Sequence, residues 1–187
     1  MINYVLASQS PRRKELMKKI SSSFLIDPSN VSEDSPKGNT PVEIVKYLAY
    51  IKGKEVKTRH KDDFIISADT IVVYNNQIIG KPSDEEDAKR ILSLLSDNTH
   101  EVYTAYHLFY QNKEADGVVK SVVTFNKLSE ELIDSYVASG SPLDKAGAYG
   151  IQDNDKFPII KKLTGSLDNV VGFPVKEIQE SIKKLLN

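Results

Sequence analysis

Residues 64–79 read FIISADTIVVYNNQII, and this stretch decides the fold class. Isoleucine, valine and phenylalanine dominate residues 64–74, which is typical of a buried β-strand. Asn75-Asn76 is a two-residue hairpin signal, so residues 77–79 are expected to pair back against that strand. Part of the sheet is therefore predicted to be antiparallel.

Helix start signals lie on both sides of this hairpin. Thr40–Glu43 and Ser83–Glu86 have the capping-box pattern, which predicts a helix from Pro41 to about Val56 and another that carries apolar residues up to Leu95. Before them, a short strand over residues 4–7 runs into Ser10, which can cap a helix that begins at Pro11.

The rest of the chain continues this alternation. We expect strands at 101–111, 117–125 and 157–163, a helix at 130–139 ended by Gly140, a helix from Pro174, and loops at 29–40 and 140–156. The pattern predicts an α/β or α+β fold on a mixed sheet. No segment is long enough to be a linker, so residues 1–187 are expected to form a single domain.

Composition excludes several classes of protein. The 187 residues hold 25 Lys+Arg and 26 Asp+Glu, a net charge of −1, which argues against nucleic-acid and polybasic membrane binders. The absence of cysteine excludes disulfides, thiolate metal sites and a cysteine nucleophile. The longest apolar run, residues 47–51, is too short to cross a membrane, and no leader peptide is visible, so we expect a cytoplasmic protein.

Arg12, Arg13 and Lys14 occupy the first turn of a predicted helix, where the helix dipole disfavours cations. One interpretation is an anion site, in which the amides of residues 8–10 and the guanidinium groups enclose a phosphate chain. The alternative is a solvated basic turn on the surface.

Asp69 interrupts the apolar strand, where a carboxylate is costly to bury. Such a residue is usually catalytic, bound to a metal or paired in a structural salt bridge. Gly80-Lys81-Pro82 follows the returning strand, so the hairpin is expected to bring Lys81 toward the end of the sheet that holds Asp69. Lys81 could then be the salt-bridge partner of Asp69 and nothing more.

Six stretches, in order along nearly the whole chain, resemble the Maf family of nucleoside triphosphate pyrophosphatases. They are Leu6–Arg13 (LASQSPRR), Ser67–Val73 (SADTIVV), Gly80–Pro82 (GKP), His100–Thr104 (HEVYT), Asp144–Gln152 (DKAGAYGIQ) and Asn169–Pro174 (NVVGFP). The resemblance implies an elongated mixed sheet flanked by helices, as in inosine triphosphate pyrophosphatases, with the substrate in a central cleft and often a homodimer. It also implies cleavage between the α and β phosphates of a nucleoside triphosphate, with Mg²⁺ or Mn²⁺ required.

The resemblance assigns Asp69 as the proton acceptor, and the chemistry of the residues agrees. A carboxylate on a rigid strand can deprotonate water or hold the metal that acidifies it, and sequence does not separate these roles. Glu33 would be the second metal carboxylate. Arg13, Lys52 and Lys81 can balance the charge of the triphosphate and the leaving pyrophosphate.

Four further residues would contact the substrate. Ser8 could add a hydroxyl to the phosphate cradle, while Arg12, Thr70 and Gln152 would distinguish bases, because an amide and a hydroxyl can match a pyrimidine edge. Thr70, next to Asp69, and Gln152 resemble the branch that acts on dTTP and UTP.

The chain departs locally from the family pattern. Gly53 stands where alanine is common, Ser141-Pro142 replaces Glu-Pro, and Asp153 replaces a glycine beside the specificity loop. Two alternative functions stay open: a nucleotide-responsive protein that regulates cell division or septum formation with little hydrolysis, and a pyrophosphatase for purine or methylated nucleotides.

Overall fold

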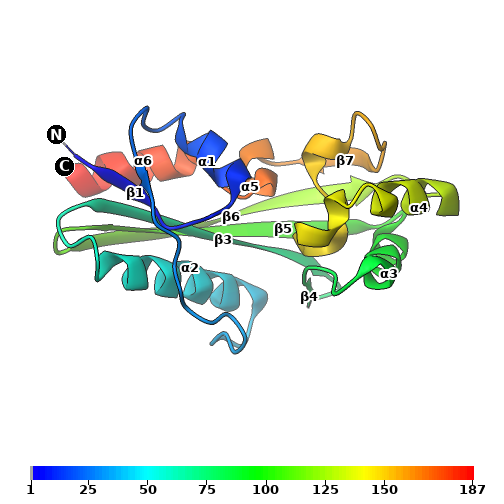
Figure 1. Cartoon of the computed structure of the whole chain (residues 1–187), viewed down its shortest axis with the longest axis horizontal. Helices are drawn as coiled ribbons and strands as arrows, with labels where there is room; N and C mark the ends of the chain where they lie inside the picture. The colour runs from blue at the N-terminus through cyan, green and yellow to red at the C-terminus, as the bar shows by residue number, and fades with distance from the viewer. Residues whose placement is uncertain (1) are drawn as a thin grey trace. The chain divides into compact units, whose positions relative to one another are not determined.

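The computed structural model describes residues 2–187, in which seven strands form one mixed sheet (Figure 1). The strands are β1 (Tyr4–Leu6), β2 (Leu25–Ile26), β3 (Phe64–Tyr74), β4 (Gln77–Ile79), β5 (Thr99–Tyr110), β6 (Lys113–Phe125) and β7 (Ile160–Thr164). Their order is β2-β1-β3-β5-β6-β7, with β4 paired to β3. The predicted fold class, a mixed sheet flanked by helices, is confirmed.

Parallel and antiparallel pairs both occur in the sheet. Strand β1 is parallel to β2 and to β3, with Val5 opposite Ile65. Strand β4 is antiparallel to β3, and the two-residue turn between them places both Asn75 and Asn76 at positive φ, as the hairpin signal predicts.

Helices flank these strands. They are α1 (Pro11–Met17), α2 (Pro41–Lys57), α3 (Glu85–Leu95), α4 (Glu130–Ala138), α5 (Leu167–Val171) and α6 (Val175–Leu186), with short 3₁₀ turns at Ser141–Asp144, Ala146–Ala148 and Ile151–Asp153. Ser10 caps α1, the Thr40 and Glu43 capping box begins α2, and Gly140 follows α4 in the left-handed conformation. All of these signals were read correctly from the sequence.

The structure corrects several predicted boundaries. Asp84 rather than Ser83 caps α3, because the Asp84 carboxylate accepts the Asp87 N–H. Strand β6 begins at Lys113, before the predicted residue 117, and β7 runs over 160–164 instead of 157–163. Strand β2 and helix α5 were not predicted. The expected loop at 140–156 contains the three 3₁₀ turns.

The chain divides into two compact units. Unit 1 contains residues 1–70, 104–119 and 172–187, and unit 2 contains residues 71–103 and 120–171. In unit 1, helix α2 lies on one face of the strands and helices α1 and α6 lie on the other (Figure 1). The side chains of strand β5 follow the same division, because Tyr106 bonds to Ser181 of α6 and His107 packs against Tyr50 of α2.

Unit 2 has its own hydrophobic core. Helices α3 and α4 pack against each other and cover apolar strand residues. The predicted apolar face of α3 is confirmed, since Ala88, Ile91, Leu92 and Leu95 are all buried there.

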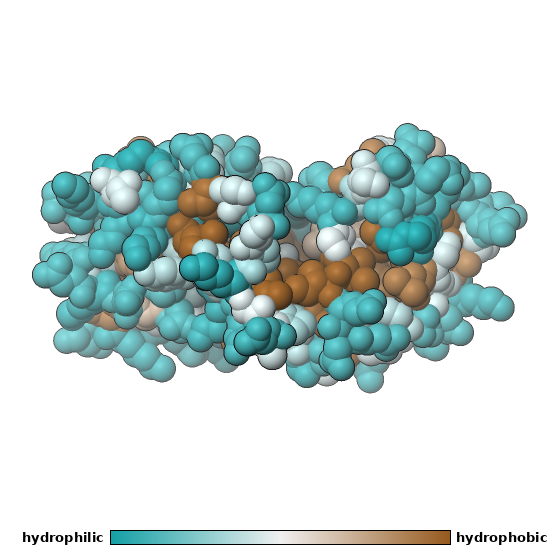
Figure 2. Space-filling view, turned by 90° about the horizontal axis from the view of Figure 1, so that it is seen from below, coloured by the Kyte–Doolittle hydropathy of each residue, from teal (hydrophilic) through white to brown (hydrophobic). Residues whose placement is uncertain are grey.

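Hydrophilic residues cover most of the molecular face seen in Figure 2, and hydrophobic residues show between them. Among residues 2–187, no helix combines the length and the apolar character needed to cross a bilayer.

Candidate functional site

Asp69 faces helix α2 from strand β3. Side chains alternate along a strand, so Asp69 points to the same face as Ser67, whose hydroxyl donates to the Ala49 carbonyl of α2 at 2.7 Å. Lys52 lies one turn beyond Ala49 on that helix, and its Nζ is 2.6 Å from Asp69 Oδ1. The partner of Asp69 in unit 1 is therefore Lys52.

Glu33 completes this group from the loop that precedes α2. Its Oε2 lies 2.8 Å from the same Lys52 Nζ. The Lys52 and Asp69 side chains are only 12% and 11% exposed, whereas Glu33 is 53% exposed. Two carboxylates thus converge on one partly desolvated ammonium group, where opposite charges interact more strongly than in water.

Gly53 permits this close approach of helix and strand. A Cβ atom at Gly53 would lie 2.4 Å from Ser67 Oγ and 2.7 Å from the Phe109 ring. The glycine that departs from the family pattern therefore has a packing role next to Lys52.

Arg13 lies on the opposite face of strand β3 and makes three hydrogen bonds. The cap by Ser10 fixes the first turn of α1, from which Arg13 Nε donates to the Gly172 carbonyl at 2.8 Å. Its Nη2 donates to Thr70 Oγ1 at 3.0 Å, and its Nη1 donates to the buried Ser8 Oγ at 3.5 Å. The structure thereby joins three residues that the sequence singled out, Ser8, Arg13 and Thr70.

The Arg13 guanidinium is influenced by both carboxylates. Burial lowers the pKa of Arg13, and the charges of Asp69 and Glu33 oppose that decrease. The charge of the preceding residue, the partly buried Arg12, lowers the pKa of Arg13 further. Cation and anion groups of unit 1 therefore form one electrostatic site.

Thr70 holds a fixed hydroxyl. Its Oγ1 accepts from Arg13 and lies 2.9 Å from the Oγ1 of Thr104, a fully buried residue of β5. Thr104 and Gly172 both occur in the sequence stretches quoted above, but no sequence pattern assigned either residue as a partner of this group.

Lys81 and Gln152 are exposed residues of unit 2. Lys81 follows Gly80, whose carbonyl accepts the Gly147 N–H at 3.0 Å, so the turn after β4 is tied to the loop that carries the Asp144–Gln152 motif. Lys81 and Gln152 thus belong to unit 2, whereas Asp69, Lys52 and Glu33 belong to unit 1.

Asp153 stabilises the backbone next to Gln152. Its Oδ2 accepts from the Tyr136 hydroxyl and from Ser141 Oγ, both at 2.7 Å, and the Gly150 N–H donates to the Tyr136 oxygen at 2.9 Å. Two of the departures from the family pattern, Ser141 and Asp153, are therefore bonded to each other.

A divalent metal is compatible with the donor set of unit 1. In the described part of the chain, no three acidic or histidine side chains gather to hold a metal by themselves. Asp69 and Glu33 nevertheless bring two carboxylates to one cation, and Mg²⁺ commonly takes one or two protein carboxylates together with waters and substrate phosphates. These two residues would hold the ion.

Solved structures of low sequence identity share the fold. A HAM1 protein from Coxiella burnetii aligns with a TM-score of 0.55 at 16% identity, covering 98% of this chain and 100% of that chain. The Ham1 protein of Staphylococcus aureus aligns with a TM-score of 0.52 at 12% identity, covering 97% and 98%.

Curated relatives are much more similar in sequence. A protein named dTTP/UTP pyrophosphatase from Bacillus cereus (strain B4264) is 42% identical over 184 residues, covering 98% of this chain and 96% of the relative. One with the same name from Agathobacter rectalis is 42% identical over 204 residues, covering 99% and 98%. The family model for Maf-like protein matches residues 3–185. This chain belongs to the Maf-like protein family.

Proposed function

We propose that this chain is a nucleoside triphosphate pyrophosphatase that hydrolyses dTTP and UTP to the nucleoside monophosphate and pyrophosphate. The names of the relatives at 42% identity support the reaction and the substrates. The observation that carries the proposal is the convergence of Asp69 and Glu33 on Lys52, with Arg13 held in the electric field of both carboxylates. This chemistry requires a metal ion, a general base and cations that neutralise the negative charge of the phosphates.

Asp69 is proposed to accept the proton of the attacking water. A carboxylate on a rigid strand keeps one position, and the ion pair with Lys52 orients it. Mg²⁺ or Mn²⁺, held by Asp69 and Glu33, would supply charge for the phosphates and acidify water. Lys52, which contacts both carboxylates, is then also placed to neutralise phosphate charge.

Cationic residues are proposed to bind the triphosphate and the leaving pyrophosphate. Arg13 is preorganised by its bonds to the Gly172 carbonyl and Thr70, which lowers the cost of ordering a long side chain. Ser8 would add its hydroxyl, and Lys81 would contribute from unit 2.

Base selection is proposed for Arg12, Thr70 and Gln152. The Thr70 hydroxyl already bonds to Arg13 and Thr104, so its contribution would include holding that arginine. Gln152 is exposed, and the Tyr136 hydroxyl, which bonds to Asp153 and to the Gly150 N–H, holds the backbone beside it. A side-chain amide held in this way can form hydrogen bonds with a pyrimidine edge.

We further propose that residues 1–187 act as one Maf-like domain in the cytoplasm, as a homodimer, with no nucleic-acid partner. The near-neutral charge balance of 25 cations and 26 anions supports the last point.

A substrate panel tests the function. Purified protein is incubated with dTTP, UTP, CTP, GTP and ATP, with and without Mg²⁺ or Mn²⁺, and products are separated by ion-exchange chromatography. Metal-dependent release of monophosphate and pyrophosphate, fastest from dTTP or UTP, is expected. Faster cleavage of a purine or methylated nucleotide would overturn the specificity, and binding without cleavage would favour the regulatory protein.

A further inference from the structure

Residues 27–33, here called the strap, lie along one side of helix α2 and end at Glu33. Three side chains spaced three and four residues apart, in α2 and the turn that follows it, hold the strap. The contacts are Lys52 Nζ to Glu33 Oε2 at 2.8 Å, the Asn30 N–H to Glu55 Oε2 at 3.3 Å, and Arg59 Nε to Asp27 Oδ2 at 2.9 Å. The strap therefore runs antiparallel to the helix, with Glu33 at one end and Asp27 at the other.

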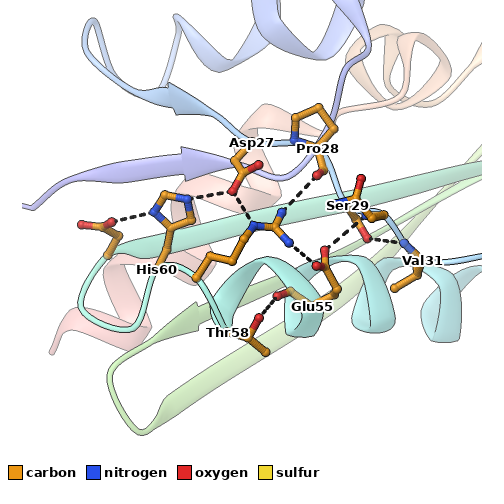
Figure 3. Close-up of polar contacts among 10 residues, drawn as sticks. Asp27, Pro28, Ser29, Val31, Glu55, Thr58 and His60 are labelled. Atoms are coloured by element: carbon orange, nitrogen blue, oxygen red, sulfur yellow. Dashed lines mark hydrogen bonds and ion pairs between the residues drawn. The ribbon is translucent and has the colours of Figure 1, made fainter.

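Arg59 makes two of the contacts at the Asp27 end, where the Asp27 N–H also donates to the Leu6 carbonyl of β1 at 3.1 Å. Besides Asp27, its guanidinium donates from Nη2 to the Pro28 carbonyl at 3.1 Å and from Nη1 to Glu55 Oε1. Figure 3 shows Asp27 and Pro28 above α2, with Glu55 reaching up from the helix toward the strap. One side chain thus links a carboxylate of the strap, its backbone and the helix residue that binds Asn30.

Asp27 is held a second time by His60. The His60 Nε2 lies 2.8 Å from Asp27 Oδ2, and its Nδ1 lies 3.0 Å from Asp63 Oδ2. The bond from Arg59 is the main cause that lowers the pKa of Asp27, followed in the same direction by His60, so the carboxylate stays ionised at neutral pH. The Asp27 end of the strap is a fixed point.

The Glu33 end has fewer constraints. Glu33 is half exposed and its ion-pair partner is Lys52. Between these ends the Asn30 N–H bonds to Glu55, which itself bonds to Arg59. Removing Arg59 would therefore weaken two of the three contacts that hold the strap and so set the position of Glu33.

We propose that Arg59 is a positioning residue that holds the strap so that Glu33 stays beside Lys52 and Asp69. The inference rests on the proposed function for its consequence, because Glu33 matters there as a metal carboxylate. Its structural part, the attachment of the strap, can be tested without substrate or metal.

The first experiment measures hydrogen–deuterium exchange in Arg59→Ala, Arg59→Lys and the unaltered protein, without metal or nucleotide. Exchange of amides in residues 29–33 is expected to become roughly tenfold faster in Arg59→Ala, most directly at Asn30, because a network of charge-assisted bonds is lost. Arg59→Lys is expected to be intermediate, since an ammonium cannot span the same acceptors as the guanidinium fork. Arg90→Ala, which removes an exposed arginine paired with Asp87 in unit 2, is the matched control.

The second experiment measures turnover as Mg²⁺ is varied. For Arg59→Ala, the Mg²⁺ concentration for half-maximal rate is expected to rise several-fold while kcat at saturating Mg²⁺ changes by less than about twofold, because a misplaced ligand weakens binding before chemistry. In a Glu33→Gln background, Arg59→Ala is expected to add no further change in metal dependence, since Arg59 acts through Glu33.

The outcomes separate the two proposals. Unchanged exchange at residues 29–33 in Arg59→Ala overturns the proposed role of Arg59 in holding the strap, whatever the activity. If exchange is faster but Arg59→Ala raises the half-maximal Mg²⁺ concentration by the same factor with and without Glu33→Gln, then Arg59 does not act through Glu33. If no nucleotide is cleaved by the unaltered protein, the proposed function fails and the exchange result alone still decides whether Arg59 holds the strap.

Discussion

Lys52 and Asp69 are joined by an ion pair of 2.6 Å that links helix α2 to strand β3. The same ammonium group contacts Glu33, so a single cation keeps two carboxylates close together before any ligand arrives. Without Lys52 between them, the negative charges of Asp69 and Glu33 would repel each other. The group is therefore preorganised for a positively charged ligand and for the phosphates that accompany it.

Replacing Asp69 with Asn is expected to lower turnover by roughly 100-fold or more, because an amide cannot accept the proton of water. Nucleotide binding should be largely retained, since the cations remain. Turnover is measured with dTTP and binding by calorimetry. Asp116→Asn is the control, because it removes the carboxylate of an exposed Lys46 ion pair of 2.7 Å. Unchanged turnover in Asp69→Asn would remove Asp69 from the mechanism.

Replacing Arg13 with Lys is expected to raise KM for the nucleotide by roughly tenfold, because an ammonium cannot bridge the Gly172 carbonyl and Thr70 as the guanidinium does. The charge is kept, so the change reports on geometry. Steady-state kinetics with dTTP measure it, and Lys18→Arg in the exposed pair with Glu15 serves as control. A KM equal to that of the unaltered protein would contradict the prediction.

Replacing Gly53 with Ala is expected to destabilise the protein by up to about 2 kcal/mol. Alanine favours a helix by about 1 kcal/mol over glycine, but its Cβ would overlap Ser67 Oγ and the Phe109 ring, and overpacking typically costs 1–3 kcal/mol. Urea denaturation measures the difference. A Gly53→Ala protein that is more stable than the unaltered one would show that α2 can move away from β3 and Phe109 without a loss of stability.

Acid is expected to destabilise the fold through His100. Burial lowers the pKa of His100 from 6.5 to about 4, and its Nδ1 has no hydrogen-bond partner among residues 2–187. The unfolded chain therefore binds a proton that the folded chain rejects between pH 6.5 and 4, so stability falls as the pH decreases through this interval. The loss reaches about 3 kcal/mol for a shift of this size.

A His100→Gln variant isolates that contribution. Glutamine can keep a bond to the Tyr149 hydroxyl, which lies 2.8 Å from His100 Nε2, but it does not titrate. Urea denaturation at pH 7 and pH 5 should show a smaller loss of stability in the variant. Equal losses in both proteins would assign the acid sensitivity to other groups.

Replacing Gln152 with Ala is expected to change the ratio of kcat/KM between dTTP and CTP by roughly tenfold, with a smaller effect on the rate for the best substrate. An exposed amide that reads the base affects selection more than chemistry. The substrate panel measures the ratio, and Asp155→Ala on the neighbouring exposed surface is the control. An equal decrease in kcat/KM for all nucleotides would argue against recognition of the base by Gln152.

Local signals in the sequence predicted most of the fold. Thr40, Ser10 and the Asn75-Asn76 turn each act over a few residues, so their effects are readable without a structure. Strand β2 was missed because Leu25–Ile26 is short and exposed, and it forms only by pairing with β1. Helix α5 has five residues, too few for a periodic pattern.

The sequence allowed candidate site residues to be chosen by identity, but it did not predict their geometry. Asp69, Lys52 and Glu33 were selected together, and the structure places them within one ion-paired group. The bond between Arg13 and Gly172 joins residues 159 positions apart, and no local pattern encodes it. Arg59 was not selected from the sequence, because its partners become visible only when the strap is placed on α2.

The bond from Arg13 to the Gly172 carbonyl has a consequence for the order in which the protein folds. Unit 1 joins residues 1–70 and 104–119 to residues 172–187, and the residues of unit 2 lie between these segments in the sequence. Arg13 and Gly172 are 159 positions apart, and contacts between distant parts of a chain form slowly because a long loop must close first. The Arg13 guanidinium is therefore expected to reach its final arrangement later in folding than local elements such as the β3–β4 hairpin.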